Sequence, residues 1–271
     1  MNRRRFRFWL GLLLWATLTY FLAAYLLLPR LWFHREHQPG LASSSALTST
    51  LQGIPGDPLN VGLVGSAGEI VRAMHLAGWF PADAVTLRSG IGIVESVMLD
   101  RPYDRAPVSN LLYEGRKQDL AFEKPVGASA SSRHHVRFWK ILEAGVEGRN
   151  VWLGAATLDS GVGLSKYTGQ VTHRISPQVD KERNALLADL IQASVITELY
   201  QLSGLGPTAN GRNGEGDWYV TDGEIRVAVI SQDAKTVGGP PGVLAESPLV
   251  LLKDGLWAAA SDWIMPVIRP N

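Results

Sequence analysis

The stretch FWLGLLLWATLTYFLAAYLLL, residues 8–28, decides the organisation of this chain. It contains no charged residue and follows Arg3, Arg4, Arg5 and Arg7. As a helix it would be about 31 Å long, which matches a hydrocarbon core of about 30 Å. Its leucines and phenylalanines together favour insertion into lipid by about 3 to 7 kcal/mol. We therefore expect residues 8–28 to form a transmembrane helix that contacts the lipid bilayer.

A secretory signal peptide is the alternative interpretation, since it also combines a basic start with an apolar run. Signal cores usually span about 7 to 15 residues, whereas Leu26, Leu27 and Leu28 extend this run past the small residues Ala23 and Ala24. More arginines precede the run than follow it closely, so the positive-inside rule predicts a cytoplasmic N-terminus. We expect a single-pass protein of the inner (plasma) membrane, with its domain outside.

The charge of the chain is concentrated at its start. The first 35 residues hold six arginines and no acids, which leaves 20 basic against 25 acidic residues in the remainder. A mildly acidic domain gives no support for a nucleic-acid partner. The chain has no cysteine, which excludes disulfides, thiolate metal sites and a cysteine nucleophile.

Composition divides the chain into four parts. These are an Arg-rich start at 1–7, the membrane helix at 8–28, a juxtamembrane segment and linker at 29–56, and one domain at 57–271 with its motif core at 57–203. Serine and threonine crowd residues 40–56, which is typical of a flexible linker. Such a linker would hold the domain roughly 20 to 25 Å from the bilayer.

The domain pattern predicts an α+β fold with a mainly antiparallel sheet and several packed helices. Residues 60–65 are typical of a buried strand, and Ser66 with Glu69 forms the sequence signature of a capping box at the start of a helix. Helical spacing also predicts helices over 87–98 and from Ser176 to about 195. Three hairpins are expected, pairing 111–113 with 120–123, 134–142 with 151–157, and 218–221 with 224–230.

Two further segments are interpreted from their composition. The glycine-rich residues 204–216 predict a loop. The apolar tail at 248–268 is interrupted by Lys253, Asp254 and Asp262, so a packed helix is favoured over a second membrane span.

The densest polar cluster is RHHVRFW at 133–139. On a strand, His134 faces one side while His135 and Arg137 face the other, about 7 Å apart. An imidazole and a guanidinium at this spacing can bind one anion together. The alternative is an exposed sheet face on which Arg137 stacks on Trp139.

Other titratable residues allow acid and base chemistry. Asp159 would orient a histidine if the fold brings it near His135 or His173. His173 can equally be a hydrogen-bonded structural residue, and Asp159 a turn former. Asp119 and Glu123 could act as paired carboxylates, or be ordinary ion-paired strand residues. A zinc ion held by His135, His173 and a carboxylate is a further alternative, but we expect no metal or other cofactor.

Seven strings occur in this order along the chain and together resemble the LssY C-terminal domain family. They are GDPLNVGLVG, AGWFPAD, RKQDLAFEKPVG, RHHVRFW, VWLGAATLDSGVGL, TGQVTHRI and VDKER. The resemblance implies a domain at a bacterial envelope, near lipid or lipid-linked phosphate chemistry. Members of this family are often fused to multi-span membrane regions, some of them phosphatase-like. The phosphatase signature does not occur in this sequence, so that activity is not transferred.

The resemblance and the residue pattern together define the candidate site. The ligand-binding candidates are Arg116, Asp119, His134, His135, Arg137 and Thr172, and the catalytic candidates are His135, Asp159 and His173. The first hypothesis is a tethered domain that binds an anionic lipid or an envelope protein partner. The second is a hydrolase of a lipid-linked or phosphate-containing substrate. The third makes these residues a buried polar network that stabilises the sheet.

Overall fold

The structure is a computed structural model of the chain. It describes residues 3–27, 37–41, 43–82, 111–126, 133–167, 169, 171–202, 209–245, 248, 251, 252, 255, 256, 258 and 259. The helix predicted at 87–98 lies outside the described residues.

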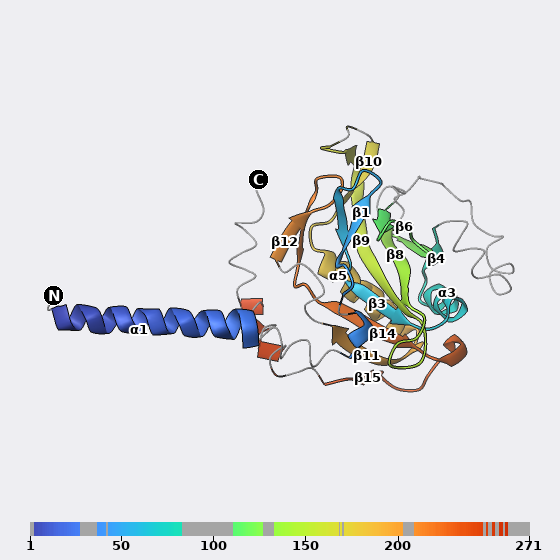
Figure 1. The fold of residues 1–271 in the computed structure, drawn as a ribbon. Coiled ribbons are helices and arrows are strands. Elements are labelled where there is room, and N and C mark those ends of the chain that lie inside the picture. The colour runs from blue at the N-terminus through green and yellow to red at the C-terminus, as the bar shows by residue number, and fades with distance from the viewer. Residues whose placement is uncertain are drawn as a thin grey trace.

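The apolar N-terminal stretch forms one long helix. Helix α1, Arg3–Leu22, continues into a π-helical turn, Ala23–Leu27, and projects away from the folded domain (Figure 1). The two segments together are long and apolar enough to cross a membrane, and none of this apolar stretch is buried inside the protein. By length and composition this helix fits a membrane anchor, although a signal sequence would have the same properties.

A nine-stranded sheet forms the centre of the domain. Its strands run in the spatial order β15 (Gly242–Val243), β11 (Ile196–Leu202), β14 (Ile225–Ile230), β3 (Val61–Val64), β9 (Val151–Leu164), β8 (Arg133–Leu142), β7 (Leu120–Pro125) and β4 (Phe80–Pro81), with β10 (Val171–Ile175) paired to β9. Among these described strands, only β11 with β15 and β14 with β3 pair in parallel. The α+β fold with a mainly antiparallel sheet is therefore confirmed.

Two smaller sheets complete the strands. One has the order β2 (Pro55–Pro58), β1 (Leu47–Thr50), β5 (Leu111–Tyr113) and β6 (Arg116–Lys117), and the other pairs β12 (Ala209–Arg212) with β13 (Trp218–Thr221). Short 3₁₀ turns lie at Pro39–Leu41 and Gln232–Ala234.

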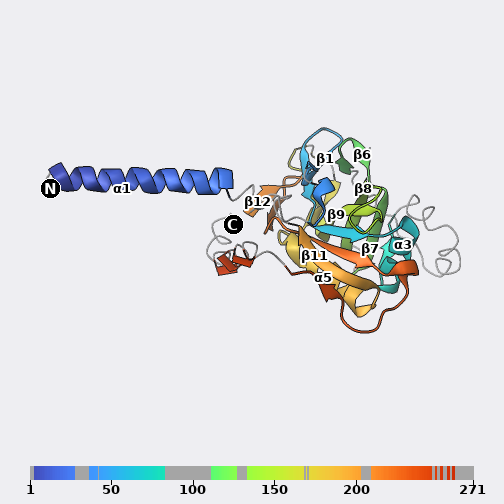
Figure 2. The ribbon, with the colours of Figure 1, turned by 60° about the horizontal axis from the view of Figure 1, so that its bottom comes forward.

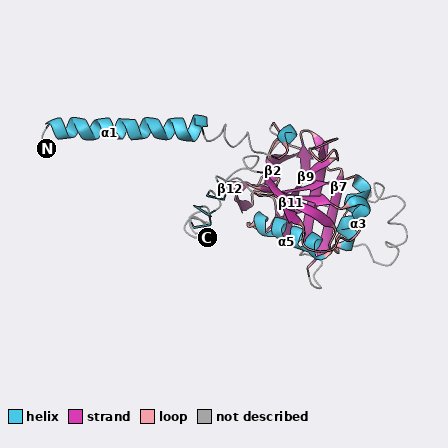
Figure 3. Cartoon of the chain, turned by 90° about the horizontal axis from the view of Figure 1, so that it is seen from below, coloured by secondary structure: helices cyan, strands magenta, loops and turns pink. Residues whose placement is uncertain are grey.

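The central sheet has a core on each face. Helices α3 (Ala67–Leu76) and α5 (Val179–Gln192) cover one face, where Val136 and Phe138 are buried. The small sheet containing β1 and β5 covers the other face, where Trp139 is buried. Figure 2 shows these layers from one side, and Figure 3 shows α3 and α5 against the strands.

The capping box predicted for α3 is confirmed. The Ser66 hydroxyl accepts a hydrogen bond from the Glu69 amide, and the Glu69 carboxylate accepts one from the Ser66 amide at 2.7 Å. The same carboxylate accepts a bond from Arg149 at 2.8 Å and from the Asp233 amide at 3.0 Å. Glu69 therefore joins the start of α3 to two distant parts of the chain.

Two of the three predicted hairpins are wrong. The pairing of β8 with β9 is confirmed, but β5 pairs with β6, while β7 joins the central sheet beside β8. The strands on either side of Asp222 and Gly223 also separate, because β13 pairs with β12 and β14 pairs with β11. Strands β5 and β13 each pair with a strand close in sequence, but not with the one predicted, and β7 and β14 join the central sheet.

The flexible linker predicted over 40–56 is also wrong. This segment contains β1 and the first half of β2, both of which belong to a sheet. Just before it, the Gln38 side chain is buried and donates to Glu147 at 2.6 Å and to the Tyr200 hydroxyl at 2.8 Å. The chain is thus attached to the domain from residue 37 onward.

Two other expectations need correction. The glycine-rich segment 204–216 contains strand β12. In the tail, the described residues are helical, but the side chains of Leu251, Leu252 and Leu256 are exposed, so the packing predicted for them is wrong. Apolar composition predicted the helix but not the surface that would bury it.

The acid sensitivity of the capping box can be predicted from Glu69. Burial by itself raises the pKa of this carboxyl, but the bonds from Arg149, Ser66 and Asp233 outweigh it and lower the pKa from 4.5 to about 2. Because the folded pKa lies below the unfolded one, the stabilisation is present above pH 4.5 and is lost as the pH falls toward 2. We expect Glu69→Gln to lower the free energy of unfolding by about 1 to 2 kcal/mol at pH 7, allowing for partial exposure.

Urea unfolding at a series of pH values would measure this loss. The difference between Glu69→Gln and the wild type should shrink as the pH is lowered through 4. A difference that stays constant with pH would contradict the assignment.

Candidate functional site

The polar side chains of β8 alternate between the two faces of the sheet, as predicted. His134 points toward α5, where its Nδ1 lies 2.5 Å from the Glu182 carboxylate. His135 and Arg137 face the other way and are 1% and 4% exposed. The alternative of an exposed sheet face is therefore wrong, because this face is buried beneath other parts of the domain.

Arg137 lies beside Asp57, the first residue of the predicted domain and not one of the predicted site residues. Its Nη1 lies 3.7 Å from Oδ2 of Asp57, a buried residue on β2. Oδ1 of Asp57 accepts a hydrogen bond of 3.2 Å from Asn213, in the turn between β12 and β13. Strands distant in sequence thus bring a cation and a carboxylate together inside the domain.

Burial controls the protonation of this pair. Burial raises the pKa of Asp57, although Arg137 and the Asn213 hydrogen bond act in the opposite direction. Burial, and to a lesser degree the Asp57 charge, raise the pKa of the Tyr219 hydroxyl to about 12. Asp57 is therefore a carboxylate that gains a proton more readily than an ordinary aspartate.

The row continues at the other end of β8. Arg133 donates to Glu123 on β7 at 2.8 Å, and its Nε lies 4.0 Å from Asp159 on β9. His135 lies between the two arginines, opposite Thr157 in the strand register. Two arginines, one histidine and three carboxylates therefore form one row, buried except for the partly exposed Glu123, in which the opposite charges nearly balance.

Arg116 and Asp119 do not belong to this row. They lie at the Lys140 end of β8, where Arg116 donates to the Lys140 carbonyl at 3.0 Å and Asp119 accepts from the Lys140 amide at 2.8 Å. The two side chains also pair with each other at 3.5 Å. Asp119 and Glu123 therefore have different cationic partners, and the interpretation of them as paired carboxylates is wrong.

The remaining candidates are only partly described. Thr172 and His173 lie on β10, where their backbones pair with Gly163 and Val162 of β9, but their side chains are outside the described part. The convergence of His173 with Asp159 stays a prediction. Within the described ranges, no group of three His, Cys, Asp or Glu side chains is arranged to hold a metal ion.

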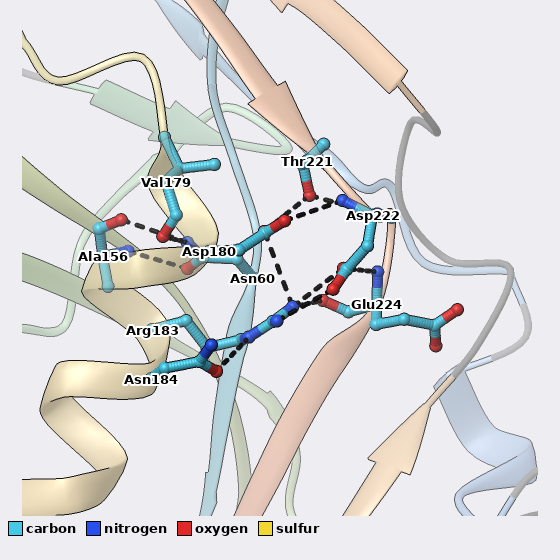
Figure 4. Close-up of polar contacts among 10 residues, drawn as sticks. Asn60, Ala156, Val179, Asp180, Arg183, Asn184, Thr221, Asp222 and Glu224 are labelled. Atoms are coloured by element: carbon cyan, nitrogen blue, oxygen red, sulfur yellow. Dashed lines mark hydrogen bonds and ion pairs between the residues drawn. The ribbon is translucent and has the colours of Figure 1, made fainter. Parts of the chain in front are cut away.

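A second buried network fixes the start of α5 to the turn between β13 and β14 (Figure 4). Arg183, 1% exposed, donates to both carboxylate oxygens of Asp222 at 2.9 Å. Asp180 accepts from the Thr221 hydroxyl at 2.9 Å and from the Asp222 amide at 2.8 Å. Burial raises the pKa of Asp180, Arg183 opposes this effect, and Asp222 adds to it.

Asn60 extends the network into the sheet. Its side-chain amide donates to the carbonyls of Ala156 and Val179, and its side-chain oxygen accepts from the Ala156 amide (Figure 4). This network explains why Asp222 and Gly223 end β13 instead of forming a hairpin, since Arg183 holds the turn against the helix.

The sequence interpretation missed three groupings. These are Asp57 with Arg137, Arg183 with Asp222, and His134 with Glu182. The last two had a weak signal, because polar residues at the start of an otherwise apolar helix suggest buried partners. Asp57 had no such signal, since its partner lies 80 positions further along the chain.

The fold and the buried row define an α+β domain behind an N-terminal apolar helix. The chain belongs to the LssY C-terminus family, whose profile matches residues 36–225. This match begins before and ends after the motif core predicted at 57–203, and it includes the attached segment around Gln38. Comparisons with curated proteins and with solved structures gave no match.

The contacts of Arg183 predict how substitution of Asp222 changes the free energy of unfolding. Asp222→Ala should lower the free energy of unfolding by about 3 kcal/mol, because it removes both short hydrogen bonds between the buried Arg183 guanidinium and this carboxylate and leaves the longer contact with Asp180 at 3.5 Å. Lys235→Ala serves as the control, since Lys235 forms an exposed pair with Asp233 and should cost less than about 1 kcal/mol. Equal losses in urea unfolding would show that burial of Arg183 is unimportant.

Proposed function

We propose that this protein is a single-pass membrane protein of the bacterial cell envelope, whose domain binds an anionic group of an envelope ligand at the Arg137–Asp57 pair. Family membership and the apolar helix support the membrane attachment. The ligand class follows from the chemistry of the pair.

The short connection to the domain supports a position at the bilayer surface. Only ten peptide steps separate Leu27, at the end of the apolar helix, from His37, whose Nε2 lies 3.1 Å from Glu147 of the domain. A fully extended chain of this length covers at most about 35 Å. A ligand within reach of lipid headgroups is therefore favoured over one far from the membrane.

The observation that carries the proposal is the burial of Arg137 against an aspartate whose pKa is raised. When Asp57 takes up a proton, the side chain 3.7 Å from Arg137 becomes neutral, while Arg137 keeps its positive charge. The carboxylates near Arg133 are already engaged with that arginine. A phosphate or other anion can then take the place of the Asp57 charge beside Arg137.

The proposal predicts a pH dependence of anion binding. Because the folded pKa of Asp57 is raised, its protonated fraction at a given acidic pH exceeds that of an ordinary aspartate, and affinity should grow as the pH is lowered. The measurement is calorimetric titration of the full chain in detergent with short-chain phosphatidylglycerol, whose charge is constant over this range, and with phosphatidylcholine for comparison. Arg137→Gln should weaken phosphatidylglycerol binding by about 10-fold or more.

Two variants make this experiment decisive. Asp57→Asn removes the competing charge, so it should bind phosphatidylglycerol more tightly at pH 8 and lose the pH dependence. Arg226→Gln removes a positive charge from β14. Arg226 lies on the face of the central sheet opposite to the core that contains Trp139, so this variant should bind as the wild type does. Wild-type affinity in Arg137→Gln would refute the proposed site.

The orientation can be tested because the chain has no cysteine. Lys235→Cys places a thiol at a position whose side chain is 78% exposed. With a cytoplasmic N-terminus, a membrane-impermeant maleimide should label this cysteine in spheroplasts, while Asn2→Cys should be labelled only after lysis. The reverse pattern would invert the proposed topology.

A further inference from the structure

The opposite face of β8 carries a histidine oriented by a buried carboxylate. Nδ1 of His134 lies 2.5 Å from Oε2 of Glu182, and the two side chains are 25% and 8% exposed. Since Nδ1 is engaged, the ring is fixed in orientation and Nε2 is the nitrogen left for proton exchange. None of the described residues hydrogen-bonds to Nε2. A buried acid, an oriented imidazole and a partly exposed ring are the elements of an acid–base dyad.

An ammonium group lies beside this histidine. Lys124 on β7 is directly opposite His134 in the strand register, so both side chains stand on the same face of the sheet. Lys124 Nζ lies 2.8 Å from Asp189 Oδ1 and is 32% exposed. An ammonium carries three donors, so this bond leaves others for a ligand.

Helix α5 holds the group together. Glu182 and Asp189 are two turns apart on the same side of the helix, and each binds one basic residue of the sheet. The Trp79 indole donates to Asp189 at 2.9 Å, and its ring lies 6.0 Å from that of His134. The imidazole and the ammonium are therefore supported by one rigid element and border the same partly exposed area.

We propose that His134, Glu182 and Lys124 form an acid–base site that hydrolyses a phosphodiester. The single negative charge of a phosphodiester suits the Lys124 ammonium. His134 Nε2 takes a proton from a water molecule, whose oxygen attacks phosphorus while the bond to the leaving oxygen breaks. The resulting imidazolium returns the proton to the leaving alkoxide, so the products are a phosphomonoester and an alcohol.

This site is independent of the proposed anion binding at Arg137, which faces the other side of β8. The structural alternative is that the His134–Glu182 bond only attaches α5 to the sheet. The two readings differ in measurable ways, since an attachment affects stability alone, whereas a base also determines how the rate depends on pH.

The test uses the full chain in detergent, with bis(p-nitrophenyl) phosphate as the soluble probe and phosphatidylglycerol vesicles as the lipid probe. The wild type should hydrolyse at least one of them above the buffer rate, and His134→Gln should lower kcat about 100-fold or more. Glu182→Gln should lower kcat and change the shape of the pH–rate profile. His75→Gln, on α3, replaces a partly exposed histidine that belongs to neither proposed site and should keep the wild-type rate.

Lys124→Gln provides a second test in case His134→Gln fails to fold. Because the Lys124 side chain is partly exposed, this variant should keep the fold intact. It should raise KM more than it lowers kcat, with an unchanged circular dichroism spectrum. No hydrolysis of either probe by the wild type, or wild-type kinetics in folded His134→Gln, would overturn the proposal. Neither result would bear on phosphatidylglycerol binding at Arg137, which is tested by the Arg137 and Asp57 variants.

Discussion

The alternation of side chains along β8 is the constraint on which the rest of the domain depends. Val136 and Phe138 pack against the helices on one face, while Arg133, His135 and Arg137 lie on the other face. A buried charge is costly unless an opposite charge lies near it. The fold must therefore bring carboxylates from β2, β7 and β9 to the strand, and Asp57, Glu123 and Asp159 are the result.

The same requirement explains the attachment of the helices and turns. Arg183 on α5 is buried with Asp222 as its closest carboxylate, so the turn after β13 is held against the helix and the two strands beside it join different sheets. His134 and Lys124 likewise pair with carboxylates of α5. Ion pairs therefore specify which elements meet, while the apolar cores supply most of the favourable free energy of burial.

The segment between the apolar helix and the central sheet also depends on contacts with distant parts of the chain. Serine-rich and threonine-rich composition is compatible with a linker, but Thr48 and Thr50 lie on a strand whose partners come from β2 and β5. Gln38 is buried with its amide bonded to Glu147 and Tyr200. The segment before β1 is therefore part of the folded domain from residue 37 onward, apart from residue 42, which the structure does not describe, and does not form a long flexible tether.

By itself the sequence determined what local chemistry controls. The apolar helix, the capping box of Ser66 and Glu69, helix α5 and the two faces of β8 all depend on residues within a few positions of one another. It could not determine the partners of β5 and β13, the burial of Arg137 against Asp57, or the pairing of His134 with Glu182. The last two contacts join residues 80 and 48 positions apart, and many acids along the chain could have served equally well. Only the tertiary structure, through sheet register and the need to pair each buried charge, selected among them.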